Sequence, residues 1–205
     1  MSALLEVQEL VVKFGLRGGD LTALNNISFS LQKGDRLGIV GESGAGKSVA
    51  GFSIINLISK PGYIADGRIL FQGQDISSLS KEEIRTVRGN QISMVFQDPM
   101  MTLNPVLTIG TQMLETLKAH RDLSDKEAQK IAIDKLRQVH IPSPEKRLHQ
   151  YPHEFSGGMR QRIIIAISLL NNPQLIIADE PTTALDVTIQ AEIMDLFMEL
   201  CEQEE

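Results

Sequence analysis

Residues 41–48 read Gly41-Glu42-Ser43-Gly44-Ala45-Gly46-Lys47-Ser48, a complete G-x-x-x-x-G-K-S loop. The loop directly follows an apolar run at residues 36–40 and precedes a stretch compatible with a helix. Glycines let the backbone wrap closely enough to aim N–H groups at phosphate oxygens, and the following helix adds a positive N-terminal dipole. We therefore predict a nucleoside triphosphate site formed by the loop and Val49. Lys47 should reach the β and γ phosphates, and Ser48 should ligate Mg²⁺.

The overall composition indicates a globular protein. Its 205 residues suit one domain or a domain with a small inserted lobe, and 42% are apolar. No segment approaches the roughly 20 uninterrupted apolar residues that a membrane helix needs. Residues 1–14 include three charged side chains, which is not typical of a cleaved secretory signal. The single cysteine, Cys201, fits the reducing cytoplasm, and the net charge of −6 disfavours a nucleic-acid partner.

The pattern of apolar residues predicts strands alternating with helices. Alternation at residues 5–14 and 27–31 indicates an antiparallel sheet near the amino end. The run at residues 36–40 is expected to form a buried central strand with its ligand at the carboxyl end. Further strands are expected at residues 69–71, 92–96 and 175–178, the last one buried. Helices are expected at residues 109–119, from a capping box at 124–127 towards 139, at 157–170, and from 188 onward.

Two consecutive acids, Asp179 and Glu180, directly follow the apolar run at residues 175–178. A strand ending there would deliver both carboxylates to the sheet edge at which the phosphate loop is expected. Asp179 would then hold Mg²⁺ through water, and Glu180 would activate the attacking water as general base. On its own, such a pair is more typical of a helix cap or a solvated turn.

A second anion site is predicted at Ser156, Gly157 and Gly158, which open the helix expected at residues 157–170. Ser156 can cap the helix and offer its hydroxyl, while the two glycines allow backbone N–H groups to approach a phosphate. Taken alone, this short sequence would indicate only an ordinary capped turn.

The order of these motifs resembles the nucleotide-binding subunits of ATP-binding cassette (ABC) transporters, over essentially the whole chain from Leu4. In sequence they are the phosphate loop, Gln97, the Ser156–Gly158 motif, the acid pair, and Ala184-Leu185-Asp186. The resemblance implies an α/β fold, with a P-loop NTPase (RecA-like) core, an antiparallel β sheet and an inserted α-helical lobe. The core would comprise residues 1–96 and 163–205, and the lobe residues 97–162.

The resemblance also assigns roles to residues that patterns alone do not single out. It implies that Phe14 stacks on adenine, although a strand phenylalanine is more often a core residue. Gln97 would meet Mg²⁺ and the membrane subunit, and Asp186 would belong to a loop that contacts a second cassette. In this family the Ser-Gly-Gly element of one subunit closes over ATP held by the phosphate loop of another.

The partners implied by the resemblance are a second ATP-binding subunit, identical or related, and transmembrane permease subunits. An extracytoplasmic solute-binding protein would be an indirect partner. The expected location is the cytoplasmic face of the bacterial inner membrane, where the protein would be peripheral.

The segment at residues 97–110 is similar to that of oligopeptide, dipeptide and nickel importer ATPases, as is Met159. Its prolines and apolar side chains suit a stiff surface that receives a partner helix. Packing of Met100, Met101 and Leu103 under the helical lobe is an equally good interpretation.

The carboxyl end departs from the family pattern. The family has a further strand that ends in a switch histidine, whereas all four histidines here precede Ser156; these are His120, His140, His149 and His153. We expect them to be surface or packing residues. The last helix has an apolar face but ends on glutamates without a cap, so a longer natural chain is expected. Without the switch histidine, the 205-residue form should bind nucleotide but hydrolyse it poorly.

We therefore expect the ATP-hydrolysing subunit of a bacterial ABC importer of peptides or a similar small solute such as nickel. Two alternatives remain open at this point. One is a soluble ABC-type ATPase of a non-transport complex, for example in phosphonate metabolism. The other is a clamp that binds ATP without hydrolysing it.

Overall fold

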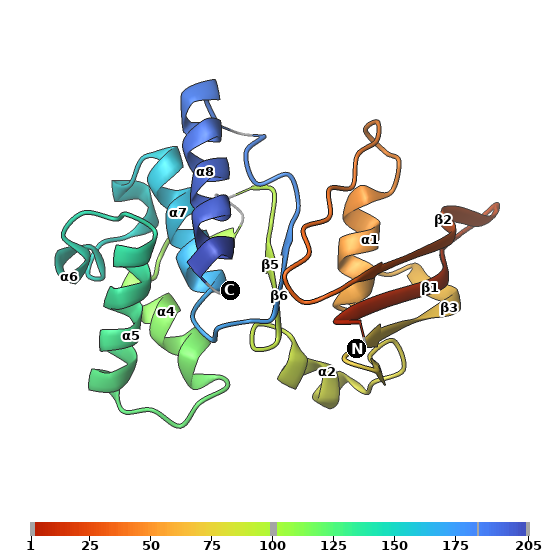
Figure 1. Ribbon diagram of the computed structural model, residues 1–205, viewed down its shortest axis with the longest axis horizontal. Coiled ribbons are helices and arrows are strands. Elements are labelled where there is room, and N and C mark those ends of the chain that lie inside the picture. Colours follow the sequence, from red (N-terminus) through yellow and green to blue (C-terminus); the bar gives the residue numbers. More distant parts are fainter. Residues whose placement is uncertain (1–2, 99–101, 184, 204–205) are drawn as a thin grey trace. The chain divides into compact units, whose positions relative to one another are not determined.

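The computed structural model describes residues 3–98, 102–183 and 185–203 (Figure 1). The chain divides into two compact units, Met1–Arg88 and Gly89–Glu205, which we call unit 1 and unit 2. Among the described residues, no helix combines the length and the apolar content that crossing a membrane requires.

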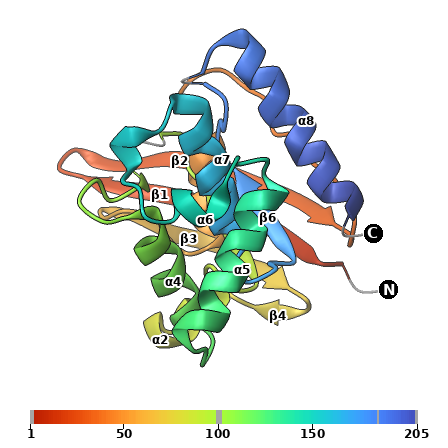
Figure 2. The same ribbon diagram turned by 90° about the vertical axis from the view of Figure 1, so that its left-hand side faces the viewer.

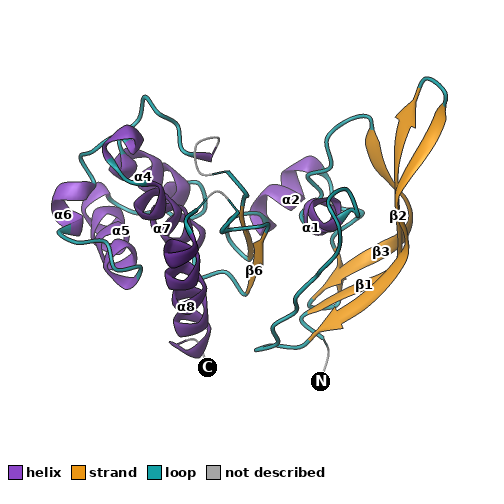
Figure 3. Ribbon diagram, turned by 90° about the horizontal axis from the view of Figure 1, so that it is seen from above, coloured by secondary structure: helices purple, strands orange, loops and turns teal. Residues whose placement is uncertain are grey.

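Unit 1 is built on an antiparallel sheet with the strand order β2-β1-β3-β4 (Figure 3). Its strands are β1 (Leu5–Leu16), β2 (Gly19–Leu31), β3 (Gly62–Phe71) and β4 (Gln74–Asp75). Leu5, Val7, Leu10 and Val12 of β1 are buried, and the step of three between Val7 and Leu10 coincides with a register shift. The antiparallel sheet predicted near the amino end is confirmed.

Two short helices complete unit 1: α1 (Lys47–Ile54) and α2 (Lys81–Val87). Arg88 follows α2 and its guanidinium donates hydrogen bonds to the carbonyl oxygens of Ile55, at 2.6 Å, and Asn56. These carbonyls lie at the carboxyl end of α1, where backbone acceptors lack helical partners. Arg88 therefore ties the two helices together.

The central strand expected at residues 36–40 does not form, and this prediction was wrong. Residues 35–42 have no regular secondary structure, and the strand pairs described in unit 1 are β1–β2, β1–β3 and β3–β4. Leu37 is 50% exposed and Val40 is 92% exposed. Apolar side chains favour burial, but a strand also needs backbone hydrogen bonds to a neighbouring strand, which this segment does not make within its unit.

Unit 2 contains a parallel pair of strands, β5 (Ile92–Val95) and β6 (Leu175–Ala178). All four residues of β5 are buried. The prediction that residues 175–178 form a strand is confirmed. Residues 175–177 are half-buried, however, and Ala178 is exposed. The apolar side chains of β6 predicted a fully buried strand. Among the described strands β6 pairs only with β5, so its other edge has no neighbouring strand to cover it.

The rest of unit 2 is helical (Figure 2). Its elements are α4 (Ile109–Lys118), α5 (Asp125–Gln138), α6 (Pro144–Arg147), a 3₁₀ turn (Pro152–Glu154), α7 (Gly157–Ser168) and α8 (Val187–Gln203). One hydrophobic core joins α4, α5, α7, α8 and β5. The helices predicted from residues 109, 124, 157 and 188 are thus confirmed.

Local signals fix the beginnings of these helices. The Ser124 hydroxyl accepts a hydrogen bond from the backbone N–H of Glu127 at 3.3 Å, and the Glu127 carboxylate accepts one from the Ser124 N–H at 2.9 Å. This is the predicted capping box. In the last helix, α8, the predicted apolar face is buried through Ile193, Leu196 and Leu200.

Candidate functional site

The glycine-rich loop lies in unit 1, immediately before α1. Gly44 and Gly46 have positive φ angles of 83° and 92°, a region that glycine occupies without steric cost. A Cβ atom on Gly46 would lie 2.8 Å from both the carbonyl oxygen of Ala23 and Cδ2 of Leu24. Both the backbone conformation and the close approach of β2 therefore require glycine at position 46.

Lys47 is the first residue of α1, and its side chain folds against the loop. Its Nζ donates hydrogen bonds to the carbonyl oxygens of Gly41, at 2.9 Å, and Glu42, at 3.1 Å. Residues 41–45 are exposed. A cation beside an exposed loop, at the N-terminus of a helix, is the geometry that binds an anion such as a phosphate. The other predicted binding residues in this segment are Ser43, Ala45, Ser48 and Val49.

Phe14 lies on β1, where it pairs with Leu21 of β2 and Gly62 of β3. Its side chain is half-buried, and its Cε1 would lie 2.7 Å from a Cβ on Gly62. The ring therefore packs closely on the Gly62 backbone. Stacking on adenine stays a prediction.

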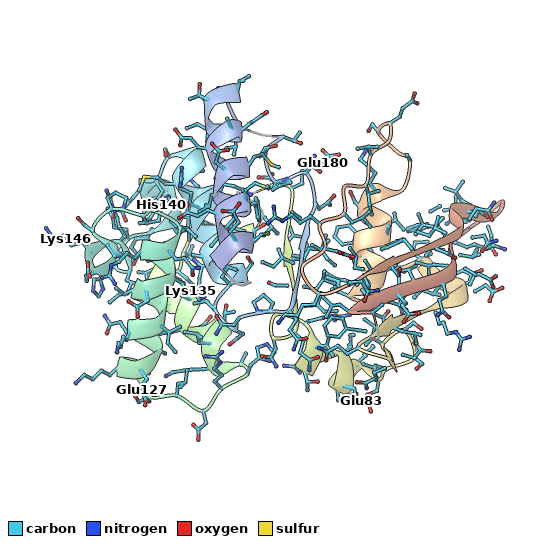
Figure 4. All side chains as sticks on the ribbon, in the orientation of Figure 1. Glu83, Glu127, Lys135, His140, Lys146 and Glu180 are labelled. Carbon is cyan, nitrogen blue, oxygen red and sulfur yellow. The ribbon has the colours of Figure 1, made fainter. Side chains whose placement is uncertain are left out.

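Gln97 and Glu180 come together in unit 2, although 83 residues separate them in the sequence. Val95 pairs with Ala178 at the carboxyl ends of the parallel strands, so the residues that follow lie at one edge. There Gln97 Nε2 donates a hydrogen bond of 2.9 Å to Glu180 Oε2. Glu180 is labelled in Figure 4. Asp179 lies at the same edge, where its N–H donates to the Val95 carbonyl at 2.9 Å.

Glu180 also bonds to Thr183, a residue that the sequence did not single out. The Thr183 hydroxyl donates to Glu180 Oε2 at 3.1 Å, and the Thr183 N–H donates to the Glu180 carbonyl at 3.3 Å. Glu180 has a φ of 45°, which is unusual for a residue other than glycine. The hydrogen bond to Thr183 depends on this tight turn, which the sequence pattern predicts only as one alternative for the acid pair.

The Ser156–Gly158 motif opens α7 as predicted. Ser156 is the N-cap, and its hydroxyl accepts a hydrogen bond from the Met159 N–H at 3.3 Å. A Cβ atom on Gly158 would lie 2.8 Å from Ile189 Cγ2, and one on Gly157 would lie 3.6 Å from Leu185 Cδ2. The motif therefore packs against the start of α8, a contact that the sequence did not predict.

The motif Ala184-Leu185-Asp186, which precedes α8, is only partly described. Ala184 lies outside the described residues. The carbonyl oxygen of Asp186 accepts a hydrogen bond of 2.9 Å from the Gln190 N–H, and the carbonyl of Leu185 accepts one of 2.9 Å from Gln190 Nε2. These bonds anchor the segment to the first turn of α8.

An ion pair that the sequence did not reveal joins α7 to α8. Arg162 Nη2 lies 2.9 Å from Glu192 Oε2, and Arg162 Nη1 donates to the Val139 carbonyl at 3.3 Å. The Arg162 side chain is only 15% exposed. Thirty residues separate Arg162 from Glu192, so only the tertiary fold brings them together.

The segment at residues 97–110 has both buried and exposed apolar side chains, and its role as a surface for a partner helix stays a prediction. Leu103 is buried at 4% exposure, whereas Val106 is 76% exposed. Met100 and Met101 lie outside the described residues. Met159 is partly buried and packs against the core of unit 2.

The phosphate loop and the strand-end acids, in an α/β protein, define the class of P-loop nucleotide-binding proteins. The predicted fold class is confirmed by solved cassettes of the same fold. Residues 24–183 match the family described as "ABC transporter", and the chain belongs to this family.

Curated relatives narrow the family further. An oligopeptide transport ATP-binding protein of Bacillus subtilis is 52% identical over 201 residues, covering 98% of this chain and 56% of that protein. A dipeptide transport ATP-binding protein of the same organism is 53% identical over 203 residues, covering 98% of this chain and 60% of that protein. The chain thus spans a little more than half the length of these two relatives.

Among solved structures, a dimeric ATP-binding cassette in a post-hydrolysis state, bound to ADP and Pi, matches with a TM-score of 0.85. It is 28% identical, and the match covers 98% of this chain and 84% of that one. A second dimeric structure of this bacterial ABC transporter cassette matches equally well.

Proposed function

We propose that this protein is an ATP-binding and ATP-hydrolysing subunit that powers a bacterial ABC importer of di- or oligopeptides, or of a similar small solute such as nickel. The names of the relatives support the peptide cargo, since they are oligopeptide and dipeptide transport proteins. The structural observation that carries the hydrolytic role is the bond between Gln97 and Glu180 at the edge of the parallel strands.

ATP binding is assigned to unit 1. Backbone N–H groups of residues 41–49 and the Lys47 ammonium would hold the phosphates, as the exposed loop and the Lys47 contacts support. Phe14 would stack on the adenine. The half-buried position of its ring on β1 leaves part of the side chain accessible.

Mg²⁺ binding is assigned to Ser48, Gln97 and Asp179. Mg²⁺ prefers oxygen ligands and usually binds through only one or two carboxylates plus phosphates and water. Asp179 and Gln97 supply a carboxylate and an amide oxygen at the same edge of the β5–β6 pair, so the residues fit the ion. When bound, it would neutralise charge on the transferring phosphoryl group.

Glu180 is assigned as the general base. Its carboxylate would take a proton from a water whose oxygen attacks the γ-phosphorus of ATP. The bond from the γ-phosphorus to the bridging oxygen breaks, so ADP leaves with that oxygen and inorganic phosphate forms. Gln97 would orient Glu180 through the observed hydrogen bond.

A second ATP-binding subunit, identical or related, would complete each site. Ser156, Gly157 and Gly158 would contact ATP bound to the partner, and the capped N-terminus of α7 supports an anion-binding role. The dimeric state of the similar cassettes supports this assembly. Residues 1–96 and 163–205 would form the ATP-binding core, and residues 97–162 the helical lobe.

The cassettes would bind transmembrane permease subunits at the cytoplasmic face of the inner membrane, and a solute-binding protein would deliver the cargo. The names of the relatives as transport proteins support this setting. The exposed Val106 in the segment after Gln97 offers apolar surface for such a contact.

The variant Glu180→Gln tests the hydrolytic role. It should bind ATP with wild-type affinity but lose turnover by about 100-fold or more, because the amide cannot accept the proton of water. Glu115→Gln, on an exposed helix surface of α4, is the matched control and should retain wild-type turnover. Phosphate release and binding of a fluorescent ATP analogue are measured with the subunits that co-purify. Undiminished turnover in the Glu180 variant would contradict the assignment.

The same preparation separates the alternatives. Co-purification with a membrane permease supports an importer, whereas a complex of soluble proteins alone supports an ABC-type ATPase outside transport. Nucleotide binding without phosphate release by the wild-type complex supports a clamp that does not hydrolyse ATP.

A further inference from the structure

Two donors converge on one oxygen of Glu180. Gln97 Nε2 lies 2.9 Å from Oε2, and the Thr183 hydroxyl lies 3.1 Å from the same atom. The two donors come from different parts of the chain, since Gln97 follows β5 and Thr183 lies three residues beyond Glu180.

The backbone brings the Thr183 hydroxyl to this place. Glu180 adopts a φ of 45°, and the Thr183 N–H donates to the Glu180 carbonyl at 3.3 Å, which closes a tight turn directly after β6. The residue at position 183 is thereby held next to the Glu180 side chain, and a short hydroxyl side chain can reach back to it. The identity of residue 183 therefore bears on the orientation of the carboxylate.

We propose that Thr183 is a positioning residue that, together with Gln97, fixes the Glu180 carboxylate for proton abstraction. Two hydrogen bonds to Oε2 restrict rotation of the carboxylate about its last side-chain bond. A general base must lie within hydrogen-bond reach of the proton that it takes, so a freely rotating carboxylate reacts less often. This inference rests on the proposed function of Glu180 as the base.

The test compares three substitutions of threonine. Thr183→Val keeps the branched shape but removes the hydroxyl, and Thr183→Ser keeps the hydroxyl. Thr188→Val makes the same chemical change at an exposed position in the first turn of α8 and is the matched control. Because residue 183 is itself exposed, none of these variants removes buried packing.

Thr183→Val should lower kcat by about ten-fold, the scale expected for losing a hydrogen bond to a charged group, with KM for ATP changed less than about two-fold. Thr183→Ser should recover most of the lost kcat, and Thr188→Val should behave as wild type. A kcat of Thr183→Val equal to wild type, or an equal loss in Thr183→Ser, would overturn the proposal.

A double-mutant cycle that combines Thr183→Val with Gln97→Ala measures the coupling between the two donors in kcat. A general structural role of Thr183 would not produce such coupling. Since both donors bond to one oxygen, their effects on kcat should be non-additive. Strictly additive effects would contradict joint positioning. If Glu180→Gln abolishes turnover while Thr183→Val does not affect it, only this inference fails. Normal turnover in Glu180→Gln, or none in the wild-type complex, contradicts the proposed function itself, and the inference fails with it.

Discussion

Gly158 and Ile189 approach so closely that a Cβ atom on Gly158 would lie 2.8 Å from Ile189 Cγ2. Real Cβ atoms essentially never come this near to another heavy atom. The first turn of α7 thus packs directly on the first turn of α8. Glycine at position 158 has a packing role in addition to its proposed role in binding a phosphate.

Gly158→Ala should therefore destabilise the protein, whereas Gly157→Ala should not. A Cβ on Gly157 would make an ordinary contact of 3.6 Å, and alanine favours a helix over glycine by up to about 1 kcal/mol. Overpacking at Gly158 should cost about 1–3 kcal/mol, which exceeds the gain in helix propensity and leaves a net loss of stability. Urea unfolding of both variants measures the difference.

The control for this contact is the Ile189→Ala background, which removes the Cγ2 atom. There Gly158→Ala should cost less than in the wild type, because the two positions are coupled. An equal cost in both backgrounds would show that the contact does not explain the need for glycine.

Gly46→Ala should destabilise the protein by more than the cost of placing alanine in the left-handed region alone. A residue other than glycine pays about 1–2 kcal/mol in the left-handed region, and here its Cβ would also meet the Ala23 carbonyl at 2.8 Å. The matched control is Gly34→Ala, since Gly34 has a φ of 86° but no heavy atom within 4 Å of its Cβ position. Both variants should lose stability, with Gly46→Ala losing more.

Nucleotide affinity separates these two glycine variants further. Gly46→Ala should weaken binding of an ATP analogue by about ten-fold or more, because it displaces N–H groups that would face the phosphates. Gly34→Ala should leave the affinity unchanged. Equal affinity in both variants would argue against the loop as the nucleotide site.

Glu127 should make stability depend on pH in the acid range. Hydrogen bonds from the Ser124 hydroxyl, the larger effect, and from the Ser124 N–H hold the pKa of Glu127 below its usual value of 4.5. The unfolded chain therefore binds the proton more readily than the folded one. The stabilisation is fully present above the unfolded pKa and is lost as pH falls through the lower folded pKa.

Thermal unfolding of Glu127→Gln between pH 7 and pH 3 tests this dependence. Glutamine can still complete the capping box, so we expect near wild-type stability at pH 7 and a smaller loss on acidification. Ser124→Ala removes the hydroxyl that donates to Glu127 but keeps the backbone N–H, so it should also reduce the acid-dependent loss. An unchanged acid profile in both variants would contradict the coupling.

Predictions from the sequence were confirmed where the structural feature depends on residues close together in the chain. The capping box at Ser124 and the N-cap at Ser156 depend on atoms within three residues of each other, and the structure shows both. The central strand at residues 36–40 failed because strand formation depends on a distant partner. The half-buried state of β6 was missed for the same reason.

The sequence by itself determined the phosphate loop, the helix beginnings and the acids that follow β6, since each depends on local backbone geometry and residue type. Only the tertiary structure decided that Gln97 bonds to Glu180, that Gly158 packs on Ile189, and that Arg162 pairs with Glu192. The partners in these three contacts are about 30 or more residues apart. Strand register and helix packing bring them together, and neither is encoded in a local pattern.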